Sequence, residues 1–304
     1  MSDYLPVKSS QINLFKKISL FYRSSNGEFL LYKKKDQGLD EHRTQDARHP
    51  ELFIRSQDKD LAIEEMTAAL NREFQESIAE EGFGRVKEAL CRLVDEALAP
   101  GQEKVMETLP HTIDVLMDTY GKDHQSMKYL ARVSGNSRIM VEHTVNVTAL
   151  VLQFCFFHDI DEISTRQLGV ASLLHDVGTA RIENTILEKK ERLTKDEFRT
   201  FSTHPLLGHE MISQHTDFDE IIPCVALEHH ERIDGSGYPK KTRQITWEGQ
   251  IIGLIDSYES LTYRAKTFRK RKTPYDSLSL IKKEVLGGRF SKEIFRQFAS
   301  CLTR

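Results

Sequence analysis

Residues 228–239 read EHHERIDGSGYP, two adjacent histidines followed by a loop rich in glycine. Adjacent positions on a helix diverge by about 100°, so two neighbouring imidazoles rarely enter one small pocket unless something between them holds both. A metal ion, or a pair of metal ions, is the obvious candidate. The glycines let the loop backbone pass close to a bound ligand. The rest of the chain has to distinguish a metal site from two polar residues on a helix surface.

Composition and charge are those of an ordinary soluble globular chain. Of its 304 residues, 29% are charged and 39% are hydrophobic, which argues against long disordered regions. The formal net charge of -3 provides no overall attraction to nucleic acid or to an acidic membrane, so we expect no DNA partner. The cysteines form no CxxC pair and indicate reduced thiols in the cytosol. They are Cys91, Cys155, Cys224 and Cys301.

Neither a signal peptide nor a membrane-spanning segment is predicted. Residues 1–10, MSDYLPVKSS, lack the apolar core of a signal peptide. The longest apolar window, residues 149–157, is interrupted by Gln153 and is too short to span a bilayer. We therefore expect a cytoplasmic protein without membrane insertion.

Residues 1–60 differ in character from the remainder of the chain. Apolar runs at 18–23 and 29–32 flank an Asn-Gly turn signal and predict a β-hairpin. A third run at 52–55 would complete a small sheet. This α+β module gives no sign of catalysis, and it is a candidate surface for protein partners.

From about residue 60 the spacing of apolar residues becomes helical and stays so. From about residue 125 onward the histidines become concentrated. We therefore predict a mainly α fold in three parts. These are a strand-containing N-terminal module at 1–60, a helical connecting region at 61–122 and an all-helical C-terminal domain at 123–304.

Seven polar residues lie on, or at the ends of, the apolar helices of the C-terminal part. Burying such side chains is costly unless they are satisfied, and each one taken singly is better explained as a core residue bonded to a backbone carbonyl. Together they lie on at least four helices, with 25 to 32 residues between clusters. We predict that they meet in the core of a helix bundle, a common place for metal sites. They are His143, His175, Asp176, His204, His229, His230 and Asp256.

A mixed set of imidazoles and carboxylates suits iron, manganese, zinc or nickel better than magnesium or calcium. Seven ligands exceed the needs of one metal and leave two octahedral metals short, so water, hydroxide and substrate oxygens would complete the set. Asp176 is a candidate bridge between two metals. Metal pairs about 3.5–4 Å apart activate water and clamp phosphate-ester oxygens during in-line attack. The sequence therefore predicts a phosphodiesterase or phosphohydrolase centre.

The order and spacing of these motifs, over about residues 125–304, resemble the HD-GYP family, a branch of the HD phosphohydrolase superfamily. The matching segments are LLHDVG at 173–178, THP at 203–205 with Gly208, HHER at 229–232 and GYP at 237–239. The resemblance implies an all-helical HD-type domain with a bi- or trinuclear metal centre. It also implies hydrolysis of the bacterial second messenger cyclic di-GMP, to linear pGpG or to GMP.

The resemblance carries the metal ligands onto the same seven residues, with Asp176 and His175 as the catalytic pair. It implies divalent metal ions, iron first and manganese second. Trinuclear members carry a glutamate where this chain has Ile139, so we predict two metals and not three. Members usually have a lysine near the catalytic phosphate where this chain has Thr179, and an aspartate where it has Glu259.

Substrate-binding residues are also implied by the resemblance. Tyr238 would lie in the Gly-Tyr-Pro wall of the substrate site, and Arg232 is a second candidate for phosphate. The family's phosphate-binding cations fall near Arg264, Lys266 and Arg269, shifted by about one position. A guanidinium grips two phosphate oxygens at once, which suits a dianionic cyclic dinucleotide. The alternative for this run is a solvated cationic loop.

Three functions are compatible with the pattern. The leading hypothesis is a phosphodiesterase that hydrolyses cyclic di-GMP through a dinuclear metal centre and a metal-bound hydroxide. The second is a catalytically weak or inactive sensor or adaptor that keeps the metal site, motivated by Thr179 and the shifted basic run. The third is a phosphohydrolase that uses the same metals on another nucleotide.

Overall fold

The structure is a computed structural model that describes residues 3–39, 49–79, 82–99, 103–121, 123–133, 139–189, 191–215, 218–262 and 271–303. The chain divides into two compact units, Met1–Ala79 and Glu80–Arg304. The predicted mainly α fold with a small strand-containing N-terminal part is confirmed. The predicted connecting region at 61–122 does not stand apart, because its residues are divided between the two units.

The N-terminal unit holds a four-stranded antiparallel sheet in the order β1-β4-β2-β3. The predicted hairpin is strands β2 and β3, paired in register at Tyr22 and Leu30, and Gly27 in its turn has a φ of 84°. Strand β1, which the sequence reading did not predict, pairs with β4. The bounds are β1 Tyr4–Val7, η1 Ser9–Leu14, β2 Leu20–Arg23, β3 Phe29–Lys33, β4 Leu52–Arg55, η2 Ser56–Asp58 and α2 Lys59–Ala79.

The described residues of the C-terminal unit form helices joined by loops, with no strand among them. Its elements are α3 Phe83–Ala97, α4 Glu103–Met106, α5 Leu109–Tyr120, α6 His124–Arg132, α7 Ile139–Phe157, α8 Glu162–Leu174, η3 Val177–Arg181, α9 Asn184–Leu187, α10 Lys195–Phe201, α11 His204–Ser213, α12 Ile221–Glu228, α13 Trp247–Thr262, α14 Pro274–Leu286 and α15 Lys292–Thr303.

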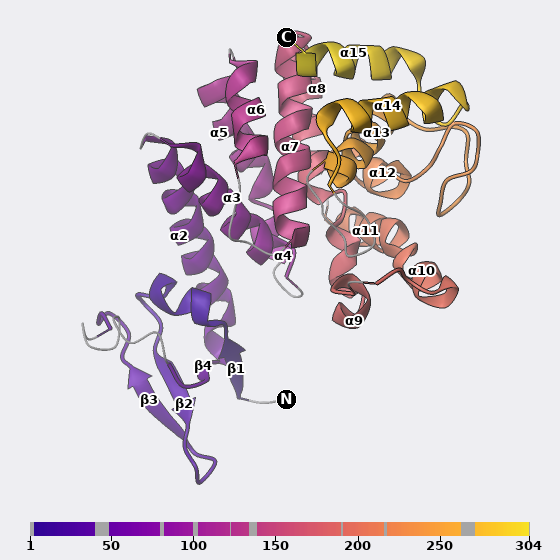
Figure 1. Ribbon diagram of the computed structural model, residues 1–304. Coiled ribbons are helices and arrows are strands. Elements are labelled where there is room, and N and C mark those ends of the chain that lie inside the picture. Colours follow the sequence, from indigo (N-terminus) through magenta and orange to yellow (C-terminus); the bar gives the residue numbers. More distant parts are fainter. Residues whose placement is uncertain are drawn as a thin grey trace. The chain divides into compact units, whose positions relative to one another are not determined.

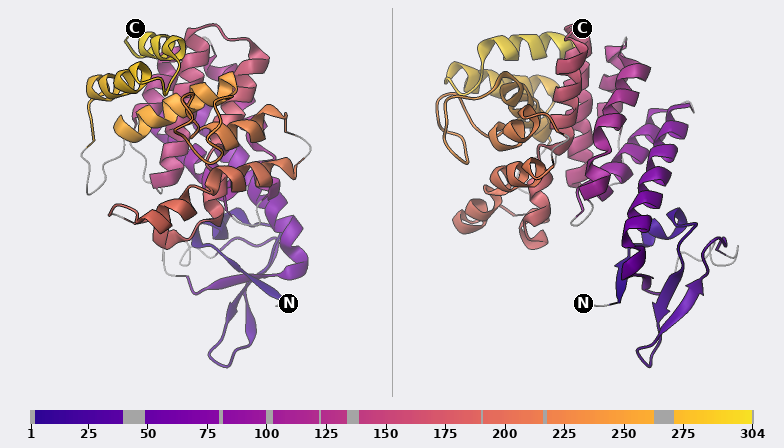
Figure 2. Two further views of the ribbon diagram at one scale, coloured as in Figure 1. Left: turned by 90° about the vertical axis from the view of Figure 1, so that its right-hand side faces the viewer. Right: turned by 180° about the vertical axis from the view of Figure 1, so that it is seen from behind.

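Helix α7 is the central element of this unit. It packs against α3, α6, α8, α13 and α15, and it runs through the middle of the unit in Figures 1 and 2. Its stretch Met140–Phe157 is apolar and long enough to cross a membrane by length and composition, yet 78% of that stretch is buried inside the fold. A helix that is apolar all round is expected in the core of a large domain. Polar residues of α7 such as His143, Asn146 and Gln153 are accordingly buried.

Local signals place the helices that bracket the polar cluster. Asp161 caps α8 by accepting a hydrogen bond from the Ser164 backbone N–H at 2.9 Å. Thr194 and Glu197 form the predicted capping box at the start of α10.

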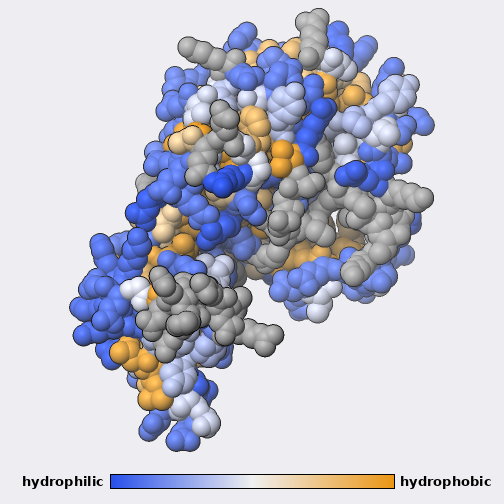
Figure 3. Space-filling view, turned by 60° about the vertical axis from the view of Figure 1, so that its left-hand side comes forward, coloured by the Kyte–Doolittle hydropathy of each residue, from blue (hydrophilic) through white to orange (hydrophobic). Residues whose placement is uncertain are grey.

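The surface seen in Figure 3 is mainly hydrophilic with scattered apolar patches, as the charged composition leads one to expect.

Candidate metal centre

The structure brings all seven predicted ligands together from separate elements of the C-terminal unit. They form two groups, and within each group the candidate ligand atoms lie within 4.8 Å of one another. Six of the seven residues are buried and one, His230, is half-buried. The first group is Asp176, His204, His229 and His230, and the second is His143, His175 and Asp256.

The carboxylate of Asp176, in the turn between α8 and η3, faces both groups. Its Oδ1 lies 3.1 Å from His204 Nε2 and 3.5 Å from His229 Nε2. Its Oδ2 lies 3.5 Å from His175 Nε2 and 3.7 Å from His143 Nε2. Each oxygen therefore serves a different set of imidazoles, which is the arrangement of a carboxylate that bridges two cations.

A second carboxylate also reaches both groups. Asp256, in the middle of α13, has Oδ1 3.1 Å from His143 Nε2 and Oδ2 3.6 Å from His230 Nδ1. The sequence reading assigned bridging to Asp176 alone, so the position of Asp256 between the groups is a feature that only the structure reveals.

Three of the imidazoles are oriented by backbone carbonyls three residues earlier in the chain. The Nδ1–H groups donate at 2.6 Å from His175 to Ser172 O, at 2.8 Å from His204 to Phe201 O and at 2.9 Å from His229 to Ala226 O. A carbonyl only accepts, so the proton lies on Nδ1 and the Nε2 lone pair points into the centre, as metal-ligating histidines require.

One of these lone pairs has no hydrogen-bond partner in the part of the chain that the structure describes. It belongs to the Nε2 atom of His175, which is buried. A buried polar atom without a partner costs about 1–3 kcal/mol. A divalent cation would satisfy this atom, and the imidazole and carboxylate donors around it match the preferences of iron, manganese or zinc. The residues present fit a metal centre.

Burial and mutual charge hold the groups in their metal-binding protonation states. Burial lowers the pKa of His175 to about 4 and also lowers that of His230. Burial alone would raise the pKa of Asp176, but the surrounding imidazoles, His175 first, hold it well below its usual range. Metals bind neutral imidazoles and ionised carboxylates. Metal binding near neutral pH therefore requires little change in the protonation of these groups.

The metal-free chain should lose stability in mild acid. His175 has a folded pKa of about 4, against an ordinary value of 6.5. Between those values the unfolded chain binds a proton that the folded chain excludes, so stability rises with pH across that window and falls as pH drops from 6.5 to 4. One such proton is worth about 1.4 kcal/mol per pH unit.

Urea unfolding of chelator-treated protein should therefore show a lower unfolding free energy at pH 5 than at pH 7. His175→Gln, which removes this titrating group, should show a shallower dependence on pH. Equal unfolding free energies at the two pH values would contradict the neutral, buried state of His175.

The glycine-rich loop folds back onto the two adjacent histidines. A Cβ on Gly237 would lie 2.5 Å from Arg232 N, Glu231 Cα and His230 O, so no larger residue fits there. The backbone N–H of Tyr238 donates to His230 O at 3.2 Å. This close approach sets the Tyr238 ring 4.7 Å from the His230 ring, at an interplanar angle of 36°.

Tyr238 and Phe198 form a short aromatic wall beside the candidate metal centre. Phe198 of α10 meets Tyr238 edge to face with centroids 5.6 Å apart, and Phe198 is itself 47% exposed. Burial raises the pKa of Tyr238, so its hydroxyl stays neutral. The wall therefore runs from the His230 ring to solvent, and Phe198 is a candidate contact that the sequence reading missed.

The other predicted substrate residues have different outcomes. Arg264, Lys266 and Arg269 lie outside the described residues. Arg232 donates to the carbonyls of His229 at 3.2 Å and Glu231 at 2.8 Å, and to Ser257 Oγ at 3.1 Å. These bonds tie the end of α12 to α13, and a phosphate contact from Arg232 stays a prediction.

The positions that depart from the family pattern are partly visible. The hydroxyl of Thr179 is buried and donates to the Asp176 carbonyl at 2.7 Å, so it supports the turn and carries no charge toward a substrate. The side chain of Ile139 lies outside the described part of the structure.

Two buried polar residues behind the candidate ligands had no role assigned from the sequence. His143 Nδ1 donates to Glu259 Oε2, and Asn146 Nδ2 donates to Glu259 Oε1 at 2.8 Å. The sequence did contain a signal for both residues, because each follows a candidate ligand by three positions on an apolar helix. Asn146 follows His143 on α7, and Glu259 follows Asp256 on α13. The i, i+3 spacing puts each pair on one helix face.

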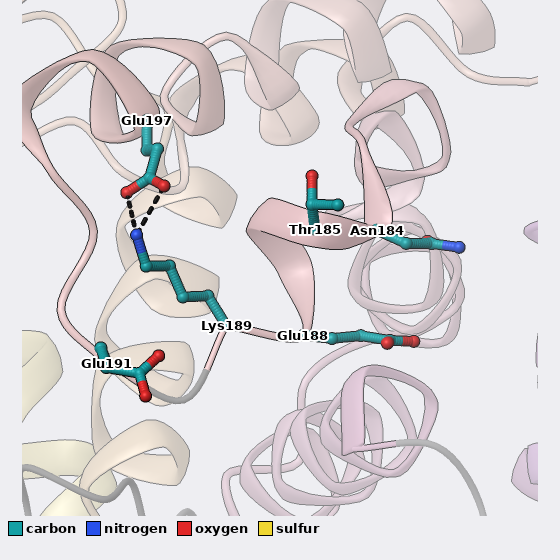
Figure 4. A pocket seen from close by; sticks show the side chains of 6 residues that line it. All are labelled: Asn184, Thr185, Glu188, Lys189, Glu191 and Glu197. Atoms are coloured by element: carbon teal, nitrogen blue, oxygen red, sulfur yellow. Dashed lines mark hydrogen bonds and ion pairs between the residues drawn. The ribbon is translucent and has the colours of Figure 1, made fainter.

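A surface recess of about 570 Å³ lies on α9 and the start of α10 (Figure 4). Within it Lys189 Nζ bonds both oxygens of Glu197, at 2.5 and 2.6 Å. None of the seven candidate ligands lines this recess, so the chemistry is not expected there. Its lining residues are Asn184, Thr185, Glu188, Lys189, Glu191 and Glu197.

One protein-family model matches more than half of the chain. This family, described as HD domain, matches residues 128–294. A cyclic di-GMP phosphodiesterase of Pseudomonas aeruginosa is 29% identical over 176 residues, which cover 57% of this chain and 42% of that protein. The cyclic di-GMP phosphodiesterase response regulator RpfG of Xanthomonas campestris pv. campestris is 31% identical over 147 residues, 46% of this chain and 38% of that protein.

The chain thus spans about two fifths of the length of these relatives. Among solved structures, an HDG"Y"P protein from Bdellovibrio bacteriovorus matches with a TM-score of 0.63 at 13% identity, covering 99% of this chain and 100% of that one. At that identity the likeness concerns the fold alone, and it extends over both compact units.

Proposed function

The chain belongs to the HD domain family, and we propose that it is a cytoplasmic phosphodiesterase. It would hydrolyse cyclic di-GMP at a dinuclear metal centre. The sequence carries the His-Asp and Gly-Tyr-Pro motifs of the HD-GYP branch. The observation that carries the proposal is the carboxylate of Asp176, whose two oxygens each face a different set of imidazoles. The two phosphodiesterase relatives support the substrate class.

The residues have distinct roles in this proposal. One group, with Asp176 Oδ1, would hold the first cation, and the other group, with Asp176 Oδ2, would hold the second. Iron is the preferred metal and manganese the second. Two such cations, when bound, supply a hydroxide nucleophile and neutralise the charge that develops on the phosphate. The backbone carbonyls behind His175, His204 and His229 keep the imidazoles aimed without reorganisation during the reaction.

The direct test is product analysis with the protein loaded with iron(II) or manganese(II). Chromatography should show conversion of cyclic di-GMP to pGpG or GMP, and His175→Ala should abolish the conversion. Intact cyclic di-GMP after prolonged incubation would contradict the catalytic claim. A panel of other cyclic dinucleotides, assayed in parallel, would reveal a different preferred nucleotide.

Thr179 supports a second candidate, a sensor that binds the dinucleotide with little turnover. Its hydroxyl is engaged with the Asp176 carbonyl, so this position offers no cation to the phosphate. Losing one transition-state donor typically costs about 10²–10³ in rate. Calorimetry separates the two functions, because tight binding of cyclic di-GMP without product favours the sensor.

Tyr238→Leu should weaken binding of the dinucleotide more than it slows the chemical step. The ring stands beside His230 and continues to the exposed Phe198, a surface on which a guanine base can stack. Base–aromatic stacking is worth about 1–3 kcal/mol, so KM should rise by about 5- to 150-fold with kcat changed less. Tyr238→Phe, which keeps the ring, should stay near the original KM.

Steady-state kinetics at equal metal content provides the measurement. Tyr275→Leu is the matched control, because Tyr275 is 78% exposed on α14. An unchanged KM in Tyr238→Leu would exclude Tyr238 from the substrate wall.

A further inference from the structure

The turn between α14 and α15 reaches back to the loop of residues 231–239. Helix α14 is closed by Gly288, whose φ of 83° is the left-handed conformation that favours glycine. The N–H of Arg289 donates to Glu284 O and that of Gly288 donates to Val285 O, both at 3.0 Å. These two bonds form a Schellman motif. They end the helix and direct the chain back to the loop.

Three contacts join this turn to the loop. The backbone N–H of Ile233 donates to Arg289 O at 3.2 Å. Arg289 Nε lies 3.8 Å from Asp234 Oδ2, but both side chains are partly exposed, so solvent screens this ion pair. The guanidinium carbon of Arg232 lies 4.4 Å from the centroid of the Phe290 ring. Because Phe290 is only 6% exposed, we expect this cation–π contact to be the stronger of the two side-chain contacts.

The N–H groups of Arg232 bind the end of α12 and the side of α13. Nη1 donates to the carbonyls of His229 and Glu231, and Nη2 donates to Ser257 Oγ. The last carbonyls of a helix have no partner within the helix, so a cation at that end satisfies them. A guanidinium stacks through its face and donates through its edge. Arg232 therefore holds the Phe290 ring and the two carbonyls at the same time.

These contacts reach the candidate metal centre through the backbone. The carbonyl oxygen of His229 faces Gly253 on α13, because a Cβ at that glycine would collide with it. Ser257, which follows Asp256 in the chain, donates to Gly253 O at 2.8 Å. Arg232 thus bonds α12 to α13 at the point where the two helices present His229 and Asp256 to the centre.

We propose that residues 287–291 clasp the loop of residues 231–239, with Phe290 as a positioning residue that acts through Arg232 and so keeps His229 and Asp256 in place. The proposal rests on the metal centre of the proposed function. It makes the connection between α14 and α15 part of that centre, although none of the candidate ligands lies there.

Amide hydrogen exchange of the metal-free chain, followed by mass spectrometry, measures the clasp directly. Phe290→Leu should raise exchange in peptides that cover residues 231–239 by about 2- to 30-fold, the effect expected from losing a desolvated cation–π contact. Phe290→Tyr keeps the ring and should preserve the protection. In calorimetry, Phe290→Leu should bind manganese(II) about 10-fold more weakly, the lower end of the usual cost of losing a group behind the ligands.

A double-mutant cycle shows whether Phe290 acts through Arg232. Arg232→Met should itself raise exchange in the loop and lower the manganese affinity. In that background Phe290→Leu should add little to either change, because the contact that it removes is already lost. Phe74→Leu is the matched control for losing a buried ring, since Phe74 is 1% exposed on α2 of the N-terminal unit. It should leave both readouts unchanged.

Unchanged loop exchange or full manganese affinity in a folded Phe290→Leu protein would overturn the proposal. Equal effects of Phe290→Leu with and without Arg232 would overturn it as well. Should Phe290→Leu fail to fold, Arg232→Met alone decides, because protection and manganese affinity like those of the unaltered chain would contradict the clasp. The exchange measurement uses neither metal nor cyclic di-GMP, so a failure of hydrolysis is distinguishable from a failure of this inference.

Discussion

Asp176→Asn should abolish hydrolysis of cyclic di-GMP and leave a chain that holds at most one metal. The substitution preserves shape, but an amide offers one oxygen where the carboxylate offers two. In the present arrangement Oδ1 lies 3.1 Å from His204 Nε2 and Oδ2 lies 3.5 Å from His175 Nε2. Whichever way the amide turns, its NH2 group faces one set of imidazoles and repels a cation there.

The expected loss reflects the contribution of a bound metal. Lewis-acid stabilisation of phosphate charge is worth several kcal/mol, and each 1.4 kcal/mol is a factor of about ten in rate. The value of kcat/KM should fall by about 10³-fold or more, with metal content measured by mass spectrometry on the same sample. Two bound metals in Asp176→Asn with more than a tenth of the activity would exclude the bridging role.

Asp161→Asn is the appropriate control. Asp161 caps the other end of α8 and accepts from the Ser164 backbone, and asparagine is as good an N-cap as aspartate. The same chemical change at that end of the helix should leave the metal content and the hydrolysis rate unaltered.

Gly253→Ala should damage the centre without touching any candidate ligand side chain. Gly253 lies three residues before Asp256 on α13, and a Cβ there would collide with the backbone carbonyl oxygen of His229 and lie 3.5 Å from its Cα. Backbone cannot rotate away as a side chain can, so α13 and the end of α12 must separate. The collision therefore moves Asp256 away from His229 and His230.

Two effects oppose each other in this variant. Alanine in place of glycine favours a helix by about 1 kcal/mol, whereas overpacking costs about 1–3 kcal/mol. Stability should thus change modestly, but displacing catalytic groups by about 1 Å costs about 10²-fold in rate. Hydrolysis rates and unfolding midpoints, measured together, test this separation of activity from stability.

Gly249→Ala is the matched control, one turn earlier on the same helix. A Cβ at Gly249 would approach Glu228 Oε2 at 2.9 Å and Thr246 Oγ1 at 3.0 Å, both on side chains that can move. This variant should retain most of the activity. Equal activity in Gly253→Ala and Gly249→Ala would contradict the backbone contact between α12 and α13.

The sequence predicted the helical fold and the clustering of the candidate ligands because both depend on local patterns. Strong apolar periodicity located the helices, and polar residues such as His143 and Asp256 stood out because apolar surroundings make them costly. Capping signals such as Thr194 with Glu197 gave a helix start within the correct turn.

The features that the sequence did not predict depend on contacts between distant residues. Lys87 meets Asn146 across 59 positions, and Asn146 meets Glu259 across 113. No local pattern records which buried lysine faces which amide, so these hydrogen bonds became visible only in the folded protein. Strand β1 and the division between the two units depend in the same way on pairing and packing that local propensity does not specify.

Titration of the metal-free chain with manganese(II), while hydrolysis of cyclic di-GMP is followed in the same samples, tests the dinuclear centre most directly. The arrangement of Asp176 between two sets of imidazoles predicts little product up to one equivalent of bound metal and a steep rise as the second equivalent binds. Full activity at one equivalent, or no product at two, would contradict a dinuclear phosphodiesterase.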